Sequence, residues 1–274
     1  MPQKIRINLS GTPPNNPFQH ASGLRALLYG WLQQSSRNVA QTVHDANQAK
    51  PFTISPLGRE DNRDSGCFFD VSLLADWLSS PVLDGLSDSS QMIRLGREGY
   101  VITGWNVVRQ ANWESLLDCG NRPRDFAFRI LTPTAHHTPG IVRKSIVAPS
   151  PELYFGSWLN RWNLCCVQAM PDEIADVVAG HLALSSFCGK TEAVRLEKDR
   201  TFIGFVGSVR FSVLAAQTLS ADAIRYLQAL ARFADFCGTG VDTSRGMGQT
   251  VLSELVSSVP DPPSESRSAA PCSS

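Results

Sequence analysis

The chain has 274 residues, and its 25 basic and 25 acidic side chains give a formal net charge of zero. That length is enough for one large domain or two small domains with real hydrophobic cores. No apolar run approaches the length that crosses a membrane, so we expect no membrane partner. A neutral charge counts mildly against nucleic-acid binding, although basic side chains gather in residues 1–50 and 94–144 and could form a positive face.

The cysteines and the amino terminus indicate the cellular compartment and whether a metal or cofactor is expected. The 7 cysteines form no CxxC pair and show no metal-ligand spacing with the histidines, so we expect no metal and no other cofactor. Free cysteines of this kind are typical of a reducing cytoplasm. The first residues, MPQKIRINLS, alternate like a strand and do not read as a signal peptide.

The first part of the chain predicts alternating strands and helices. Alternation of apolar and polar residues predicts strands at 4–9, 52–57, 64–71 and 100–108. Apolar residues at helical spacing predict helices at 21–33, 38–47 and 72–78 and a helical turn at 113–117. The turn-rich sequence Gly-Asn-Arg-Pro at 120–123 then indicates a domain boundary.

The second part repeats this order. The same patterns predict strands at 126–131, 201–213 and 249–255 and helices at 152–162 and 221–236, while 173–182 and 191–199 stay undecided. A β-α-β order in both parts indicates the α+β class, with two tandem ferredoxin-like domains that are each an antiparallel sheet backed by helices. We place them at residues 1–122 and 123–256. The Pro/Ser-rich tail at 257–274 is expected to be disordered.

A glycine-rich loop follows the last predicted helix. The sequence GTGVDTSRGMGQT at 238–250 contains Gly238, Gly240, Gly246 and Gly248, with Arg245 among them. Glycine permits a positive φ and a close approach of backbone, and exposed N–H groups in such a loop suit a phosphate. The spacing matches neither GxGxxG nor a P-loop, and both of those motifs follow a strand. The simpler alternative is a glycine-capped helix followed by a hairpin.

Four patches in chain order resemble a known family. They are HDANQAKPFTISPLG, FRILTPTAHH, PELYFGSWLNRWN and GTGVDTSRGMGQT. Together they are similar to the CRISPR-associated endoribonucleases that cut repeat RNA, the Cas-six family of the RAMP superfamily. One position departs from the family pattern, because Asp242 stands where the family loop often carries a lysine.

The resemblance implies two RRM-like ferredoxin folds and metal-independent cleavage of precursor CRISPR RNA. The 2′-hydroxyl attacks the neighbouring phosphate and leaves a 2′,3′-cyclic phosphate and a 5′-hydroxyl. CRISPR repeat RNA is the expected partner, and other subunits of a CRISPR effector complex are further candidates. The alternative function is a non-catalytic RNA-binding subunit of such a complex, since one fold serves many functions. A third is an unrelated two-domain scaffold whose glycine loop is only a hairpin.

The candidate catalytic residues are His44, Tyr29 and Lys50. A histidine exchanges protons near neutral pH, as the transfer to or from a ribose oxygen requires. The spacing of the three residues matches the catalytic trio of some family members. The alternatives are an exposed histidine at a helix end, a packed tyrosine and a solvated lysine. His20, which opens the first helix, is the rival catalytic histidine.

The candidate RNA-binding residues are basic or lie in the glycine loop. They are Gly238, Gly240, Arg245, Gly246, Gly248, Arg129, Arg143 and Lys144. Ordinary solvated charge is the alternative for the last three. Two further histidines, His136 and His137, could contact RNA, but we interpret them as surface loop, and His181 as a core histidine. Core packing is also the expectation for Trp105 and Tyr100, with stacking on unpaired RNA bases as the alternative.

Overall fold

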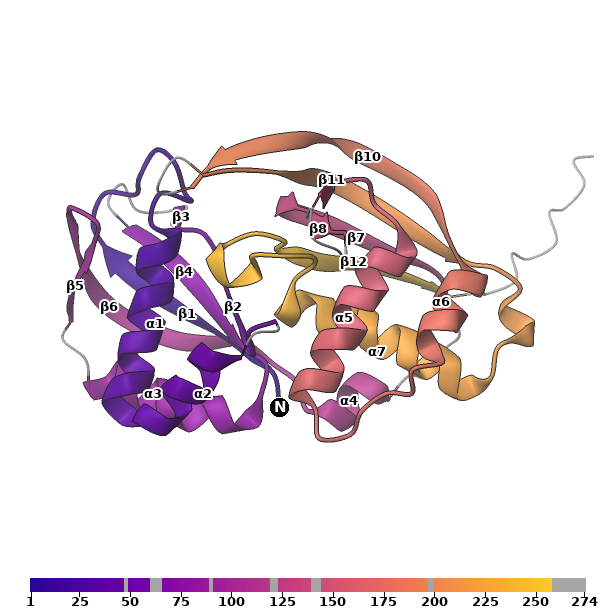
Figure 1. The fold of residues 1–274 in the computed structure, drawn as a ribbon, viewed down its shortest axis with the longest axis horizontal. Helices are drawn as coiled ribbons and strands as arrows, with labels where there is room; N and C mark the ends of the chain where they lie inside the picture. The colour runs from indigo at the N-terminus through magenta and orange to yellow at the C-terminus, as the bar shows by residue number, and fades with distance from the viewer. Residues whose placement is uncertain are drawn as a thin grey trace, which may run out of the picture.

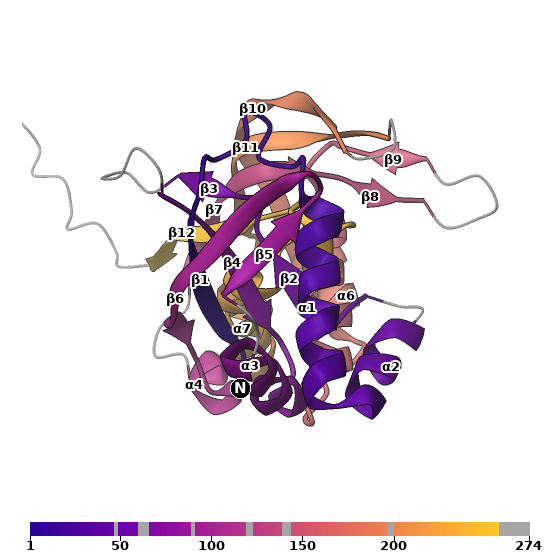
Figure 2. The same cartoon turned by 90° about the vertical axis from the view of Figure 1, so that its left-hand side faces the viewer.

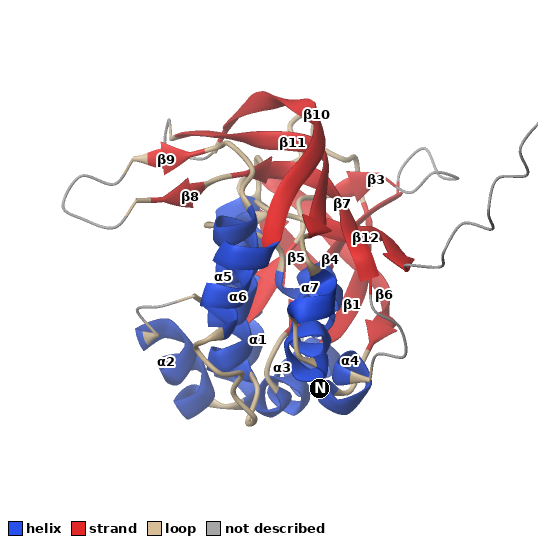
Figure 3. Ribbon diagram, turned by 90° about the vertical axis from the view of Figure 1, so that its right-hand side faces the viewer, coloured by secondary structure: helices blue, strands red, loops and turns tan. Residues whose placement is uncertain are grey.

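The structure is a computed structural model that describes residues 1–46, 49–59, 66–88, 91–118, 123–138, 144–196 and 200–257. Two halves lie side by side, with the amino-terminal half on the left of Figure 1 and the carboxy-terminal half on the right. Figure 3 shows helices gathered on one side and strands on the other. The predicted boundary at 122/123 abuts residues outside this description, and the tail beyond 257 lies outside it, so both stay predictions.

The amino-terminal half is a ferredoxin-like unit with extra strands. Its sheet has the order β2-β4-β1-β6-β5, with β3 paired to β4. The strands are β1 (Gln3–Ser10), β2 (Phe52–Ile54), β3 (Gly58–Arg59), β4 (Gly66–Leu73), β5 (Met92–Leu95) and β6 (Glu98–Gln110). The helices are α1 (Ala21–Ser35), α2 (Arg37–Asp45), α3 (Ser79–Asp88) and α4 (Trp113–Leu117). Alternate residues of β1 are buried because they face the helices.

The helix expected at 72–78 is the main error in this half. Strand β4 continues to Leu73, where Ser72 pairs with both β1 and β2. Only a 3-10 turn at Asp76–Leu78 follows before α3 begins at Ser79. Pro81 lies in the first turn of α3, where a missing N–H costs nothing. The apolar run at 72–78 therefore reflects burial of a strand end, since short apolar runs do not distinguish strand from helix.

The carboxy-terminal half has the ferredoxin-like order β10-β11-β7-β12. Its strands are β7 (Pro123–Thr134), β10 (Leu182–Arg195), β11 (Thr201–Val213) and β12 (Thr250–Ser257), with a small separate sheet of β8 (His136–His137) and β9 (Ser145–Ile146). The helices are α5 (Pro151–Cys165), α6 (Ile174–His181) and α7 (Ala221–Cys237). Ser150 and Ser220 cap α5 and α7 by accepting N–H bonds from Leu153 and Ala223. Both halves confirm the predicted α+β class.

Several connections hold the halves together. The hairpin of β10 and β11 arches over the molecule toward the amino-terminal half (Figure 1). A buried cluster joins that hairpin to both halves through Phe18, Ala21, Ala135, Val194, Leu196, Phe202 and Met247. On β6, Arg109 forms an ion pair with Asp235 of α7. Thr53 on β2 donates to the Phe236 carbonyl at 3.0 Å. The two halves therefore share buried surface.

Candidate functional site

The glycine loop is closed by the protein's own backbone. Gly238, Gly240, Gly246 and Gly248 have φ values of 63°, 77°, 90° and 68°. A Cβ on Gly240 would lie 2.2 Å from the Ala135 oxygen, and one on Gly248 would lie 2.0 Å from the Thr239 oxygen. Thr239 donates its N–H to Gly248 at 2.8 Å. Close packing within the chain therefore requires glycine at these positions.

The tip of this loop carries a small charge network. Asp242 has a left-handed φ of 56° and accepts from Arg200 at 2.6 Å and from Arg245 at 3.3 Å. Arg245, which sequence reasoning assigned to RNA, is therefore already paired with a carboxylate. Gly246 packs against the other half, where an added Cβ would lie 3.2 Å from the Pro56 nitrogen. The loop tip is consequently part of the interface between the halves.

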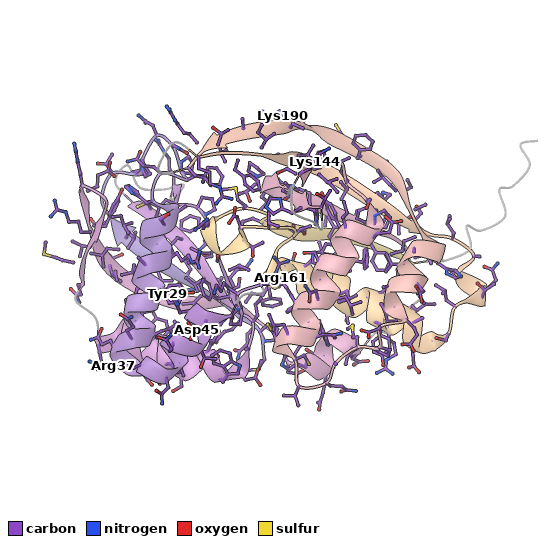
Figure 4. The ribbon with its side chains drawn as sticks, viewed as in Figure 1. Tyr29, Arg37, Asp45, Lys144, Arg161 and Lys190 are labelled. Atoms are coloured by element: carbon purple, nitrogen blue, oxygen red, sulfur yellow. The ribbon has the colours of Figure 1, made fainter. Side chains whose placement is uncertain are left out.

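The structure brings Tyr29, His44 and Lys50 together on one side of the amino-terminal half. His44 lies in the last turn of α2 with its side chain 74% exposed, and its ring centroid is 6.1 Å from that of Tyr29 on α1. The Tyr29 hydroxyl reaches the Val43 carbonyl at 3.5 Å. Both side chains line a groove between α1 and α2. Figure 4 shows Tyr29 on α1 of the amino-terminal half.

Lys50 fixes the end of α2. Its Nζ donates to the carbonyls of Val43, His44 and Ala46 at 2.9, 2.9 and 2.7 Å. A cation at a helix carboxyl end is favourable because the last carbonyls have no partner inside the helix. Burial lowers the pKa of Lys50, and the nearby Arg25 lowers it further. The lysine thus positions the backbone that carries His44.

His20 lies in a different environment. It is 2% exposed, and its Nε2 lies 2.8 Å from Glu98 Oε2. Tyr100 donates to the same carboxylate oxygen at 2.7 Å, and burial raises the pKa of its hydroxyl. This cluster ties the residues before α1 to the hairpin of β5 and β6. His20 is therefore a buried, engaged histidine, apart from the groove that holds His44.

A cleft of about 550 Å³ separates the two halves next to these residues. From the amino-terminal half it is lined by Arg25 and Lys50, and from the carboxy-terminal half by α5, β8 and the glycine loop. Arg161 of α5 contributes to its floor and is 5% exposed. Sequence reasoning missed Arg161, although a charged residue on the buried stripe of α5, beside Trp158 and Trp162, was the available signal.

The remaining expected residues are spread more widely. Arg129 is exposed on β7, and Lys144 precedes β9, where its carbonyl accepts from Thr138 at 3.0 Å. Figure 2 shows β8 and β9 on the same side of the molecule as α2. Arg143 lies outside the described residues. Of the described residues, neither Arg129 nor Lys144 lines the cleft that the glycine loop borders.

Two histidine interpretations are wrong. His136 is 8% exposed and stacks at a tilt 5.5 Å from Tyr154, so it is not a surface-loop residue. Burial lowers the pKa of His136 to about 4, and the nearby Arg161 adds to this effect. His181 is half-buried at the end of α6, beside the Thr218 hydroxyl at 3.3 Å, and is not a core residue.

Tyr100 and Trp105 differ in burial. Tyr100 is buried at 2% exposure, as expected, whereas Trp105 is 39% exposed.

No helix in the described part of the chain is long and apolar enough to cross a membrane. Within the same residues, no group of three or more His, Cys, Asp or Glu side chains is placed to hold a metal ion.

Comparisons with known proteins agree on one family. The family model "CRISPR-associated endoribonuclease Cas6" matches residues 128–250. A Streptococcus thermophilus protein of that description is 26% identical over 153 residues, which are 54% of this chain and 59% of that protein. The chain thus matches little more than half the length of this curated relative.

Solved structures cover much more of the chain. The Thermus thermophilus Cas6 (TTHB231) product complex is 27% identical and superimposes with a TM-score of 0.80, over 92% of this chain and 99% of that one. The Cas6 (TTHA0078) product complex is 25% identical with a TM-score of 0.73, over 92% and 99% of the two chains. The likeness therefore spans both ferredoxin-like halves.

Proposed function

Because this chain belongs to the Cas6 family of CRISPR-associated endoribonucleases, we propose that it binds CRISPR repeat RNA and cleaves precursor CRISPR RNA to give guide RNA. In the proposed reaction the 2′-hydroxyl loses its proton and attacks the adjacent phosphorus. The bond from phosphorus to the 5′-oxygen breaks, and that oxygen takes up a proton. The products are a 2′,3′-cyclic phosphate and a 5′-hydroxyl, and side chains supply the proton transfers without a metal.

The observation that carries this proposal is the meeting of Tyr29, His44 and Lys50. Lys50 lines the cleft between the halves, and Tyr29 and His44 line the groove between α1 and α2. An imidazole can accept or donate a proton near neutral pH, so His44 serves as the general acid or base. Its exposed side chain is accessible to a strand of RNA. Tyr29 lies at the edge of the His44 ring and can orient it.

Lys50 has two roles in the proposal. Its three hydrogen bonds hold the chain that carries His44, and its positive charge lowers the energy of the phosphorane that forms during attack. Arg25 adds a second positive charge close by, with its guanidinium carbon 5.6 Å from the Tyr29 ring centroid. The cleft thus has cations near the proposed acid–base residue.

The test is single-turnover cleavage of labelled repeat RNA in excess EDTA. We expect the wild type to yield a cyclic phosphate end. His44→Ala should slow cleavage by about two to four orders of magnitude and leave binding nearly unchanged, because phosphate contacts dominate affinity. His181→Ala is the matched control, because His181 is also partly exposed but lies on α6. His20→Ala tests the rival histidine.

The outcomes separate the alternatives. Cleavage that stops with EDTA and returns with magnesium would contradict the metal-independent mechanism. Tight binding of repeat RNA without cleavage by the wild type would instead support the non-catalytic subunit. If His20→Ala abolishes cleavage in a protein that still folds and His44→Ala does not, the acid–base residue is His20.

A further inference from the structure

Four buried polar atoms without a hydrogen-bond partner gather where α5 meets β8. They are His136 Nε2, His137 Nδ1, Tyr154 Oη and Arg161 Nε. Tyr154 and Arg161 are seven residues apart, so they lie on the same face of α5, and the His136 ring is 5.5 Å from that of Tyr154. Each such atom costs about 1–3 kcal/mol. A cluster of this kind indicates that a polar group binds nearby.

Arg161 gives this cluster an uncompensated positive charge. Its guanidinium donates to the Ser157 hydroxyl at 2.6 Å, to the Gly240 carbonyl at 2.5 Å and to the Thr243 hydroxyl at 3.3 Å. All three partners are neutral, and no carboxylate of the described residues forms an ion pair with it. A buried charge without a counter-ion is costly, so the site favours an anion.

The cleft provides access for that anion. Arg161, His136 and His137 line it from one half, and Arg25 and Lys50 line it from the other. Figure 4 shows Arg161 on the side of the carboxy-terminal half that faces Tyr29. The cleft has two acidic side chains along its lining in the described residues. Glu152 is exposed, and Asp242 already has two arginine partners.

The volume of the cleft limits the size of the ligand. Its volume of about 550 Å³ falls in the range of sites for small molecules. One nucleotide of a single strand fits such a space, whereas a duplex is far too wide. The walls come from both halves, so a strand bound there contacts both ferredoxin-like units.

We propose that the floor of this cleft binds one phosphodiester of a single-stranded segment of RNA, with Arg161 as its main cation and Arg25 and Lys50 on the opposite wall. The assignment rests on the proposed function, because Lys50 connects this cleft to His44 and Tyr29. A phosphate held here keeps the neighbouring nucleotide beside the acid–base residue. Arg161 thereby binds and positions the strand and takes no part in proton transfer.

The first test removes the charge of Arg161 and keeps a polar side chain at this position. Arg161→Gln carries amide N–H donors on a shorter side chain. The matched control is Arg232→Gln, because Arg232 on α7 also donates to backbone carbonyls, those of Ser115 and Asp118. Binding is measured with repeat RNA that carries a 2′-deoxy nucleotide at the cleavage position, over a range of salt concentrations. Melting by circular dichroism shows whether each variant is folded.

We expect Arg161→Gln to weaken binding by about tenfold or more, because a charge-assisted contact is lost. The slope of log affinity against log salt should fall by about one, as for one lost phosphate contact. The control, Arg232→Gln, should match the wild type in both affinity and salt slope. A folded Arg161→Gln with unchanged affinity and salt slope would overturn the proposal and leave water as the partner of the buried atoms.

The second test follows the His136 imidazole in the wild type by NMR. The charged or titratable groups that face it are Arg161 of α5 and the adjacent His137. A phosphate at the cleft floor offsets the Arg161 charge, so a short single-stranded oligoribonucleotide should raise the pKa of His136. Inorganic phosphate tests whether the phosphate group alone suffices. No shift with the oligoribonucleotide would overturn the proposal.

The two tests also separate this inference from the proposed function. If the wild type cleaves repeat RNA but the His136 and Arg161 results are negative, only the cleft assignment fails. If the wild type neither binds nor cuts repeat RNA, and the oligoribonucleotide still raises the His136 pKa, the proposed function fails and the phosphate site stands.

Discussion

Replacement of Arg109 by methionine should destabilise the protein by about 3 kcal/mol. Arg109 on β6 pairs with Asp235 of α7, whose side chain is 1% exposed. Asp235 also accepts the Leu252 N–H at 2.6 Å. Removal of one partner of a buried ion pair costs about 3–5 kcal/mol, because the remaining charge is left without compensation. We expect a loss at the lower end of this range, because Arg109 is half-exposed and the ammonium of Lys4 also lies near Asp235.

The assay is urea and thermal unfolding at several pH values. A loss of about 3 kcal/mol lowers the melting temperature by about 6–12 °C for a protein of this size. Burial raises the pKa of Asp235, and loss of Arg109 should raise it further. A carboxyl whose folded pKa exceeds its unfolded value binds more protons when folded, so its penalty grows as pH rises. The deficit should therefore be larger at pH 8 than at pH 5.

Two controls make the result specific. Arg225→Met removes an exposed arginine whose partner Asp222 is 70% exposed, so it should cost less than about 1 kcal/mol. Asp235→Asn, added to Arg109→Met, should recover most of the loss because the amide oxygen still accepts from Leu252. A deficit below about 1 kcal/mol at pH 8, or an equal deficit at pH 5 and pH 8, would refute the reasoning.

Four further predictions concern single positions. Gly248→Ala should cost more than about 2 kcal/mol in urea unfolding, because φ is 68° and the new Cβ would lie 2.0 Å from the Thr239 oxygen. Gly180→Ala, with open space around it in α6, should instead stabilise by about 0.5–1 kcal/mol. Thr239→Val should cost about 1–3 kcal/mol, because it leaves the buried indole N–H of Trp158 without its acceptor. Hydrogen bonds from a tyrosine and a histidine lower the pKa of Glu98, so the stability that Glu98 contributes is lost as pH falls below about 4. In Glu98→Gln, the free energy of unfolding measured between pH 6 and pH 3 should lose this part of its pH dependence.

Local sequence patterns predicted the elements whose burial follows one period. The alternation around Ile5 and Ile7 and the stripe through Leu227 and Leu230 are both buried as expected. Such periodicity indicates which face of a helix or strand packs against a core, and it can be recognised without knowing what the element packs against. They are enough to place a β-α-β order and the ferredoxin-like class.

The floor of the cleft could not be predicted in this way. Arg161 is held by Gly240, which is 79 residues away in sequence, so its burial depends on packing that no local pattern contains. The same holds for His136, whose position after a Thr-Pro-Thr turn suggested an exposed loop. The resemblance located Tyr29, His44 and Lys50 by their spacing, while the hydrogen bonds of Lys50 to the end of α2 emerged only from the structure.

The position of the glycine loop in the chain has a consequence for synthesis. The cleft is walled by Arg25 from the first helix and by residues 240–244, which leave the ribosome about 200 residues later. At about 5–20 residues per second, the amino-terminal half waits about 10–40 s for the segment that completes the cleft. A nascent chain can therefore fold its first sheet early but gains the cleft, and the RNA binding proposed for it, only when translation nears its end. Fragments that end before residue 240 should accordingly lack the phosphate site proposed for the cleft.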